Sequence, residues 1–261
     1  MSKQLKLSVV VPSLNHGEFI GATLDSLFTQ RDIRPGELEV IVMDGGSRDN
    51  TVEIIKRYGH KIDQWVSEPD AGQTDALIKG FARATGDILG WLCSDDLLEP
   101  WTVRQVLDCF VRSADAEFLY GDATWIDKSG YPIKFKKEIP FNWYIWLHDH
   151  NYIPQPAAFW RRRLYEQAGG LDRSFDLAMD GDLFARLAKR SPPRHVTRQW
   201  ARLRSYPEQK NKRLRCISDQ EDRVIRERLG VSYENPIAVK MRYCVAKTLR
   251  VGWKLALGAY R

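Results

Sequence analysis

The sequence lacks several features that would assign it to a specialised class of protein. It has only four cysteines, and they are too scattered to form the close pairs typical of structural zinc or redox sites: Cys93, Cys109, Cys216 and Cys244. No apolar run approaches the roughly 20 residues that a membrane-spanning helix needs. The short apolar-biased stretch before Pro12 is too brief for a signal peptide. We therefore expect reduced thiols and a cytoplasmic protein.

Low-complexity tracts and internal repeats are also missing, and the 43% hydrophobic and 28% charged residues are close to the averages for soluble globular proteins. Charge divides the chain in two. The chain has 40 Lys+Arg and 34 Asp+Glu in total. Residues 1–182 contain 20 basic and 28 acidic residues, whereas residues 183–261 contain 20 basic and only 6 acidic residues. The acidic front half argues against a nucleic-acid-binding protein. The basic rear half suits anionic partners such as phosphates or a lipid surface, or is a solvated basic face.

Strand and helix patterns alternate over the first part of the chain. Short apolar runs rich in β-branched residues predict strands at 7–12, 38–43, 62–66 and 87–93. Apolar residues at helical spacing predict helices at about 17–29, 49–58, 73–84 and 101–111. This alternation predicts an α/β fold with a Rossmann-like, mostly parallel sheet flanked by helices. In such sheets ligands bind beyond the carboxyl ends of the strands.

After residue 116 the pattern changes. Three short runs, with a turn at 128–130, predict a small antiparallel extension at 117–120, 123–126 and 132–135. Further strands are expected at 155–160 and beyond Arg198, and helices at about 180–190, 217–229 and from Pro236. An aromatic segment could stack on a sugar or lipid acceptor or pack in the core: Phe141, Trp143, Tyr144 and Trp146.

Two adjacent carboxylates follow the fourth predicted strand. Asp95 and Asp96 would repel each other at the sheet edge, and a divalent cation such as Mg²⁺ or Mn²⁺ would relieve that repulsion. An Asp-Asp pair alone is also typical of a helix cap or a solvated turn. The topology brings Asp44, Asp70 and Asp75 to the same edge, so a phosphate ligand would tolerate this acidic rim only through a metal.

Four motifs follow one another along the chain: Val9-Val-Val-Pro-Ser-Leu-Asn15, Val42-Met-Asp-Gly-Gly-Ser-Arg-Asp-Asn-Thr51, Ser67-Glu-Pro-Asp-Ala-Gly-Gln73 and Ser94-Asp-Asp96. Together they resemble glycosyltransferase family 2, the inverting nucleotide-sugar enzymes of GT-A fold. The resemblance runs from about residue 7 to 210, and Met179-Asp-Gly-Asp-Leu-Phe184 is similar to the family's downstream acidic motif. It implies a GT-A domain at 1–212, with a nucleotide-sugar-binding half at 1–116 and an acceptor half at 117–212. A basic helical extension follows at 213–261.

The resemblance also implies residue roles. The nucleotide base and ribose would be contacted by Pro12, Ser13, Asn15 and Asp44. The donor would be approached from the third and fourth strand ends by Asp70, Gln73, Asp75, Ser94 and Asp95. Gln73 and Asp75 could instead cap a helix. Asp96 would bind Mn²⁺ or Mg²⁺.

The acceptor hydroxyl must lose its proton as it attacks the anomeric carbon, so a carboxylate is needed opposite the leaving diphosphate. Asp180 matches the position of the family's catalytic base, although it could instead cap a helix. Tyr206 occupies the place where family members often carry a histidine, which leaves the remaining metal ligands open. His148-Asp-His150 has a ligand-like spacing but no third partner, so we leave it out of the metal site.

The expected activity is transfer of a sugar from a nucleotide-diphosphate sugar, with a UDP-sugar favoured, to a hydroxyl of a saccharide or lipid-linked acceptor in surface polysaccharide or glycolipid synthesis. A nucleotidyltransferase-like enzyme and a non-catalytic nucleotide-sugar-binding protein are the alternatives. A dinucleotide oxidoreductase would need a Gly-x-Gly-x-x-Gly motif after the first strand, and the sequence has none there. The tail at 239–261 mixes basic and apolar residues, which suits either a helix at the cytoplasmic membrane surface or a basic helix packed on the domain.

Overall fold

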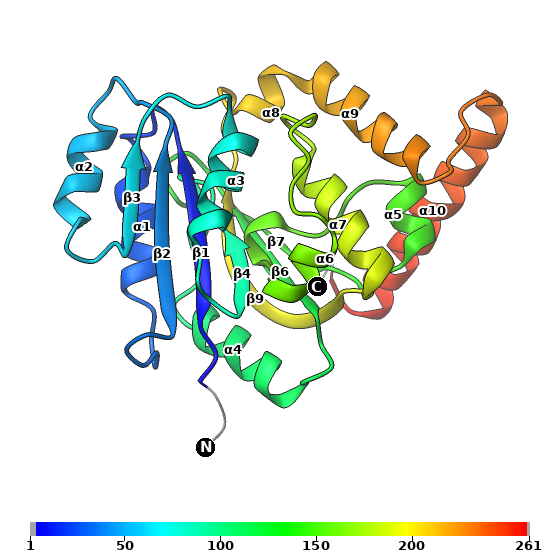
Figure 1. The fold of residues 1–261 in the computed structure, drawn as a ribbon. Coiled ribbons are helices and arrows are strands. Elements are labelled where there is room, and N and C mark those ends of the chain that lie inside the picture. Colours follow the sequence, from blue (N-terminus) through cyan, green and yellow to red (C-terminus); the bar gives the residue numbers. More distant parts are fainter. Residues whose placement is uncertain (1–3, 260–261) are drawn as a thin grey trace.

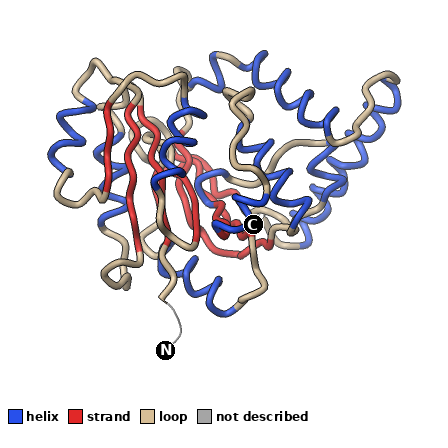
Figure 2. Tube along the Cα trace, viewed as in Figure 1, coloured by secondary structure: helices blue, strands red, loops and turns tan. Residues whose placement is uncertain are grey.

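The computed structural model describes residues 4–259, so the outermost residues of the predicted ranges, 1–3 and 260–261, lie outside the described part. One sheet runs through the molecule with the strand order β3-β2-β1-β4-β8-β6-β9-β5, and β7 pairs with β6 (Figure 1). Helices lie on both sides of this sheet (Figure 2). The predicted α/β class with a flanked, mostly parallel sheet is confirmed.

The front half contains the four predicted strand–helix units. The four strands of these units pair in parallel: β1 (Leu7–Ser13), β2 (Leu38–Asp44), β3 (Gln64–Ser67) and β4 (Ile88–Trp91). The helices that connect or follow them are α1 (Ile20–Phe28), α2 (Thr51–Tyr58), α3 (Gln73–Arg83) and α4 (Thr102–Arg112). Each agrees with its prediction within a few residues. The sequence analysis did not predict β5 (Leu97–Leu98), because two residues are too short for a periodic signal.

Alternate residues of the central strands enter two different cores. Val9 and Val11 of β1 pack with apolar residues of α1, α2 and α4, whereas Val10 packs with residues of α3 and α7 (Met179–Arg190). This alternation follows from the period of two in a strand and explains why β1 is apolar throughout. Gly80 lets α3 approach the sheet closely, because a Cβ there would lie 2.4 Å from Cγ1 of Val10.

The rear half extends the sheet. Its strands are β6 (Phe118–Ile126), β7 (Pro132–Lys136), β8 (Ala158–Arg161) and β9 (Arg194–Arg204). The strand β6 is antiparallel to β7 and β8 but parallel to β9. The prediction of two separate strands at 117–120 and 123–126 was wrong, since β6 is one continuous strand. The apolar run of β6 is interrupted by Gly121. Glycine is needed at this position because a Cβ there would lie 2.6 Å from the Trp200 ring. The register with β9 also shifts at Asp122.

The remaining helices of the rear half are α5 (Trp143–His148), the 3₁₀ turn η1 (Gln155–Ala157), α6 (Arg162–Gln167), α8 (Lys210–Arg213), α9 (Arg215–Arg228) and α10 (Pro236–Ala256). Within the aromatic segment, Trp146 is buried in the core while Tyr144 is partly exposed. The division of the chain at residue 212 stays a prediction, although Ile225 of α9 joins the main core. Within residues 4–259, none of the helices has both the length and the apolar character that crossing a bilayer requires.

Candidate active site

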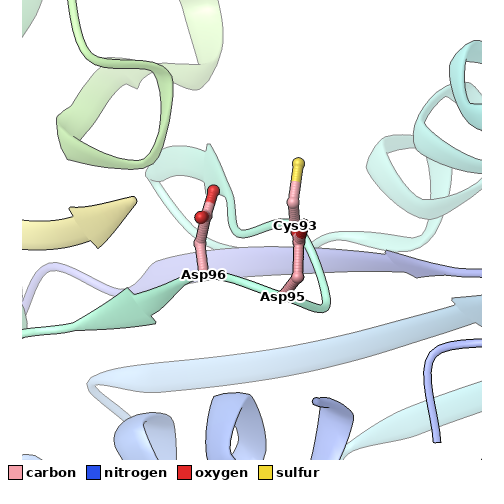
Figure 3. Close-up of side chains that lie close together, drawn as sticks. All are labelled: Cys93, Asp95 and Asp96. Carbon is pink, nitrogen blue, oxygen red and sulfur yellow. The ribbon is translucent and has the colours of Figure 1, made fainter. Parts of the chain in front are cut away.

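The carboxyl ends of β1, β2, β3 and β4 meet at one edge of the sheet, because these strands are parallel. The turn after β4 carries the central cluster. One ligand atom each of Cys93, Asp95 and Asp96 lies within 4.8 Å of the others. Figure 3 shows the three side chains projecting to the same side of the turn. Cys93 was not among the expected site residues, although it stands only two residues before Asp95.

The Asp96 carboxyl lies in an unfavourable environment for a negative charge. Burial and the neighbouring charge of Asp95 raise the pKa of Asp96 well above its usual value, although the backbone N–H of Arg204 donates to its Oδ1 at 2.8 Å. Burial and the same two carboxylates raise the pKa of the Cys93 thiol. A divalent cation would offset the repulsion between the two carboxylates and favour their ionised forms, and carboxylate oxygens are ligands that Mg²⁺ and Mn²⁺ accept. The donor set of this turn therefore fits a divalent metal.

The Asp95 carboxylate is held from the rear half of the chain. Its Oδ2 accepts hydrogen bonds from the Tyr206 hydroxyl at 2.9 Å and from Nε2 of Gln209 at 3.3 Å. Arg204 reaches the same turn through Nε, which donates to the Asp95 backbone oxygen at 2.8 Å. The guanidinium of Arg204 lies over the Phe19 ring. Tyr206, which stands where the resemblance leads us to expect a histidine, thus contacts Asp95 through its hydroxyl.

The end of β2 forms a tight turn around Asp44. Its carboxylate accepts hydrogen bonds from the backbone and hydroxyl of Ser47 at 2.9 and 2.5 Å and from the Ser67 hydroxyl at 2.7 Å. Asn15 joins this turn, because its backbone N–H donates to Oγ of Ser47 at 2.7 Å. These contacts give Asp44 the turn role expected of an Asp-Gly-Gly sequence, and they fix it at the sheet edge.

The other predicted residues of β1 lie beside this turn. Pro12 and Ser13 are buried, and Oγ of Ser13 has no hydrogen-bond partner among the described residues. Asn15 is exposed and adopts the left-handed backbone conformation, with φ of 52°. A buried hydroxyl without a partner is uncommon in folded proteins.

Two predicted residues that follow the third strand make different contacts. Gln73, at the first position of α3, points to the central cluster and donates through Nε2 to Sγ of Cys93 at 3.3 Å. Asp75 is instead paired with Lys79 at 3.1 Å and Arg173 at 3.1 Å. It also accepts a hydrogen bond from the backbone N–H of Ala71 at 3.4 Å, just before the start of α3.

Asp70 lies closer to the end of β2. A Cβ on Gly45 would lie 2.7 Å from Oδ2 of Asp70, so glycine allows the two loops to meet. Ser94 stands in the turn after β4, where its Oγ lies 2.7 Å from Nδ1 of His16. Its backbone oxygen accepts a hydrogen bond from Thr23 of α1, and so does that of Asp96, both at 2.9 Å. Thr23 therefore fixes the turn that carries both carboxylates.

Asp180 lies in the first turn of α7, but Ala178 is the capping position and makes no side-chain cap. Burial raises the pKa of Asp180 to about 6, while the backbone N–H of Gly181 counteracts the rise. Nδ2 of Asn151 donates to its Oδ2 at 3.3 Å. The charge of Asp180 contributes to the raised pKa of Cys93, so the structure brings Asp180 near the central cluster. Such a carboxyl can change protonation state near neutral pH.

Comparisons with known proteins agree with this geometry. The model of glycosyl transferase family 2 matches residues 8–166. An uncharacterized glycosyltransferase of Mycobacterium tuberculosis is 31% identical over 189 residues, which cover 72% of this chain and 71% of that protein. A PGL/p-HBAD biosynthesis glycosyltransferase of Mycobacterium bovis is 29% identical, covering 73% and 72%. The chondroitin synthase of Escherichia coli is 25% identical over 74% of this chain but only 28% of its own length.

Two solved structures share the fold. The S. aureus TarS fragment 1–349 in complex with UDP-GlcNAc has a TM-score of 0.65 at 19% identity, covering 80% of this chain and 61% of the fragment. The mannosyltransferase PcManGT from Pyrobaculum calidifontis, in complex with GDP-Man and Mn²⁺, has a TM-score of 0.63 at 19% identity, covering 94% and 70%. These likenesses confirm the GT-A type of fold. Since the family model matches more than half of its residues, the chain belongs to glycosyl transferase family 2.

Proposed function

We propose that this glycosyltransferase moves a sugar from a nucleotide-diphosphate sugar, with a UDP-sugar favoured, to a hydroxyl of a saccharide or lipid-linked acceptor, with inversion at the anomeric carbon. The single observation that carries the proposal is the cluster of Asp95 and Asp96 with Cys93, whose thiol is close enough to Asp180 for the charge of that carboxyl to raise its pKa. Similar proteins support the donor class, since the S. aureus TarS fragment is in complex with UDP-GlcNAc and PcManGT is in complex with GDP-Man. Surface polysaccharide or glycolipid synthesis is the corresponding pathway class.

In this proposal the strand ends hold the donor. Asp44 and Asn15 border the nucleotide, the free hydroxyl of Ser13 faces a ligand, and Asp95 holds the sugar or ribose. Asp96 would hold Mn²⁺ or Mg²⁺, and such an ion would supply positive charge against the departing nucleotide diphosphate. Pro12, Asp70, Gln73, Asp75 and Ser94 complete the proposed donor contacts.

Asp180 acts as the general base. The acceptor oxygen attacks the anomeric carbon while its proton passes to the Asp180 carboxylate, and the bond to the nucleotide diphosphate breaks in the same displacement. One displacement inverts the configuration and forms no covalent enzyme intermediate. Asn151 orients the carboxylate by donating to its Oδ2.

The test is a panel of UDP-, GDP- and dTDP-sugars, each assayed with Mn²⁺ or Mg²⁺ for binding and for product. Free nucleoside diphosphate indicates glycosyl transfer, whereas pyrophosphate would indicate a nucleotidyltransferase. Asp96→Ala should lose metal-dependent donor binding, and Asp180→Asn should keep binding but lose transfer. Asp219→Asn is the matched control, because Asp219 is exposed on α9. Normal transfer by Asp180→Asn would require another base.

We also propose that α10 contacts an anionic membrane surface. Its basic residues Arg250 and Lys254 turn inward and pair with Asp149 at 2.5 Å and Glu138 at 3.2 Å. Ile237 and Leu255 are 73% and 62% exposed. Both stand nine residues from the fully buried Ala246, about two and a half turns, and so lie on the opposite side of the helix. An exposed helix surface that carries large apolar residues together with cations such as Lys240 and Lys247 suits an anionic membrane interface, where a lipid-linked acceptor would be found.

A further inference from the structure

A cavity of about 210 Å³ lies between α5, α9 and α10. It is several times larger than the roughly 30 Å³ that a water molecule takes up in the liquid. None of its lining residues belongs to the proposed donor site. The polar part of the wall includes His148, Arg226, Tyr233, Arg242 and Tyr243.

Arg226 is fixed in the cavity wall and has an unused donor. The residue is only 7% exposed. Its two terminal nitrogens donate to the backbone oxygens of Leu147 at 2.8 Å and Asp149 at 3.3 Å, and it pairs with Asp222 at 2.8 Å. Its Nε–H is buried without an acceptor. These contacts hold the guanidinium in a fixed position in the cavity wall.

Arg242 of α10 has a similar arrangement. One terminal nitrogen donates to the Ser232 backbone oxygen at 2.5 Å, and the buried Nε–H has no acceptor. Among the described residues, no carboxylate lies within ion-pair distance of this guanidinium. The charge of this guanidinium is therefore not neutralised by the protein and can attract an anion in the cavity.

The carboxylate in the wall does not offset these positive charges. Asp149 faces Arg250 at 2.5 Å and His150 at 3.0 Å. Burial raises the pKa of Asp149, but the hydrogen bonds from these two side chains outweigh the rise and lower it, so the carboxylate is ionised and already paired. Further cations lie over the two tyrosine rings of the wall, because Arg223 is 4.8 Å from the Tyr233 ring and Lys247 is 5.5 Å from the Tyr243 ring.

We propose that this cavity binds a phosphate group, with the guanidinium groups of Arg226 and Arg242 as the cationic part of its wall. Planar guanidinium groups suit phosphate oxygens, and neither arginine can lose its charge. The rest of the wall includes the apolar side chains of Leu147, Val231 and Val239, which suit carbon attached to the phosphate. The ligand class is therefore a phosphate ester, either a small soluble one or the headgroup of a lipid phosphate. This site does not depend on the proposed sugar transfer.

The experiment measures binding of two probes to the full chain by calorimetry in EDTA, which suppresses metal-dependent binding at the donor site. Inorganic phosphate tests the group itself, and monomeric dodecyl phosphate tests the same group on an apolar chain. Arg242→Gln should weaken both by about tenfold or more, because one charge-assisted hydrogen bond is lost. The matched control is Lys240→Gln, which removes one charge from the exposed side of α10 and should bind like the wild type.

The outcomes distinguish a lipid phosphate from a small soluble phosphate ester. Tighter binding of dodecyl phosphate than of inorganic phosphate identifies a lipid phosphate, and equal binding identifies a small phosphate ester. Val239→Phe fills the cavity without changing charge, so it should abolish binding even if Arg242→Gln does not fold. Absence of binding of both probes to the wild type would overturn the proposal. Equal losses in Arg242→Gln and Lys240→Gln would overturn it too, since they would indicate a general charge effect.

Discussion

The Tyr206 hydroxyl donates a hydrogen bond to Oδ2 of Asp95 at 2.9 Å, and both residues are buried. Burial and the charge of Asp95 raise the pKa of Tyr206 far above its usual value, so the hydroxyl remains a donor at neutral pH. A histidine in the same place would offer a nitrogen lone pair instead of a proton. The identity of residue 206 therefore bears directly on the number of metal ligands.

We predict that Tyr206→His binds Mn²⁺ more tightly than the wild type, by about tenfold, because an imidazole nitrogen adds a ligand that this metal accepts. Calorimetric titration with Mn²⁺ would measure the change. Tyr206→Phe separates the added nitrogen from the lost hydroxyl, since it only removes the hydrogen bond from residue 206 to Oδ2 of Asp95. If the two variants bind Mn²⁺ equally, residue 206 does not reach the metal.

The sequence predicted the turn at Asp95 and Asp96 because the parallel topology dictates where the fourth strand ends. It did not reveal Cys93, because a small apolar-like residue at the end of a strand gives no signal of where its Sγ points. Gln209 and Asn151 were also missed, since they lie in loops without periodicity and act through single contacts with Asp95 and Asp180. The position of residues at or just after the ends of parallel strands was predictable, whereas the contacts made by residues in other loops depend on tertiary packing.

We predict that transfer activity rises with pH through an ionisation near 6. Asp180 has a pKa of about 6 because it is buried, and only its deprotonated form accepts the acceptor's proton. Asn151→Ala removes the hydrogen bond to the carboxylate, so the ionised form loses stabilisation and the rise should move to higher pH. Rate measurements from pH 5 to about 8 would show the shift. An unchanged midpoint in Asn151→Ala would assign the ionisation to another group.

Asp180→Asn should also stabilise the fold at pH 8. The folded pKa of about 6 lies above the ordinary value of 3.8, so the ionised carboxyl costs stability above pH 6 and the cost disappears as pH falls towards 4. We expect the free energy of unfolding to rise by about 1 kcal/mol at pH 8, allowing for partial exposure, with no gain at pH 4. Urea denaturation at both pH values would measure it. Equal effects at both would mean that charge burial is not the cause.

The close approach of α3 to β1 predicts opposite effects of the same substitution at two helical glycines. Gly80→Ala should lower the free energy of unfolding by about 1–3 kcal/mol, because the new methyl would lie 2.4 Å from Cγ1 of Val10. Gly252→Ala, in α10, has open space around it and should raise stability by about 0.5–1 kcal/mol through helix propensity. Thermal and urea unfolding of both variants would check the contrast. Tolerance of Gly80→Ala would show that the sheet and helix can separate.

The outward face of α10 gives the last prediction. Leu255→Glu adds a negative charge to an apolar, exposed position opposite the buried Ala246, so it should weaken binding to vesicles that contain phosphatidylglycerol. Co-sedimentation with these vesicles, and with pure phosphatidylcholine vesicles, would measure both the apolar and the electrostatic contribution. Val111→Glu is the matched control, because Val111 is 60% exposed on α4, far along the chain. If truncation before α10 leaves sedimentation unchanged, this helix is not the membrane contact, and its exposed apolar residues must serve another partner.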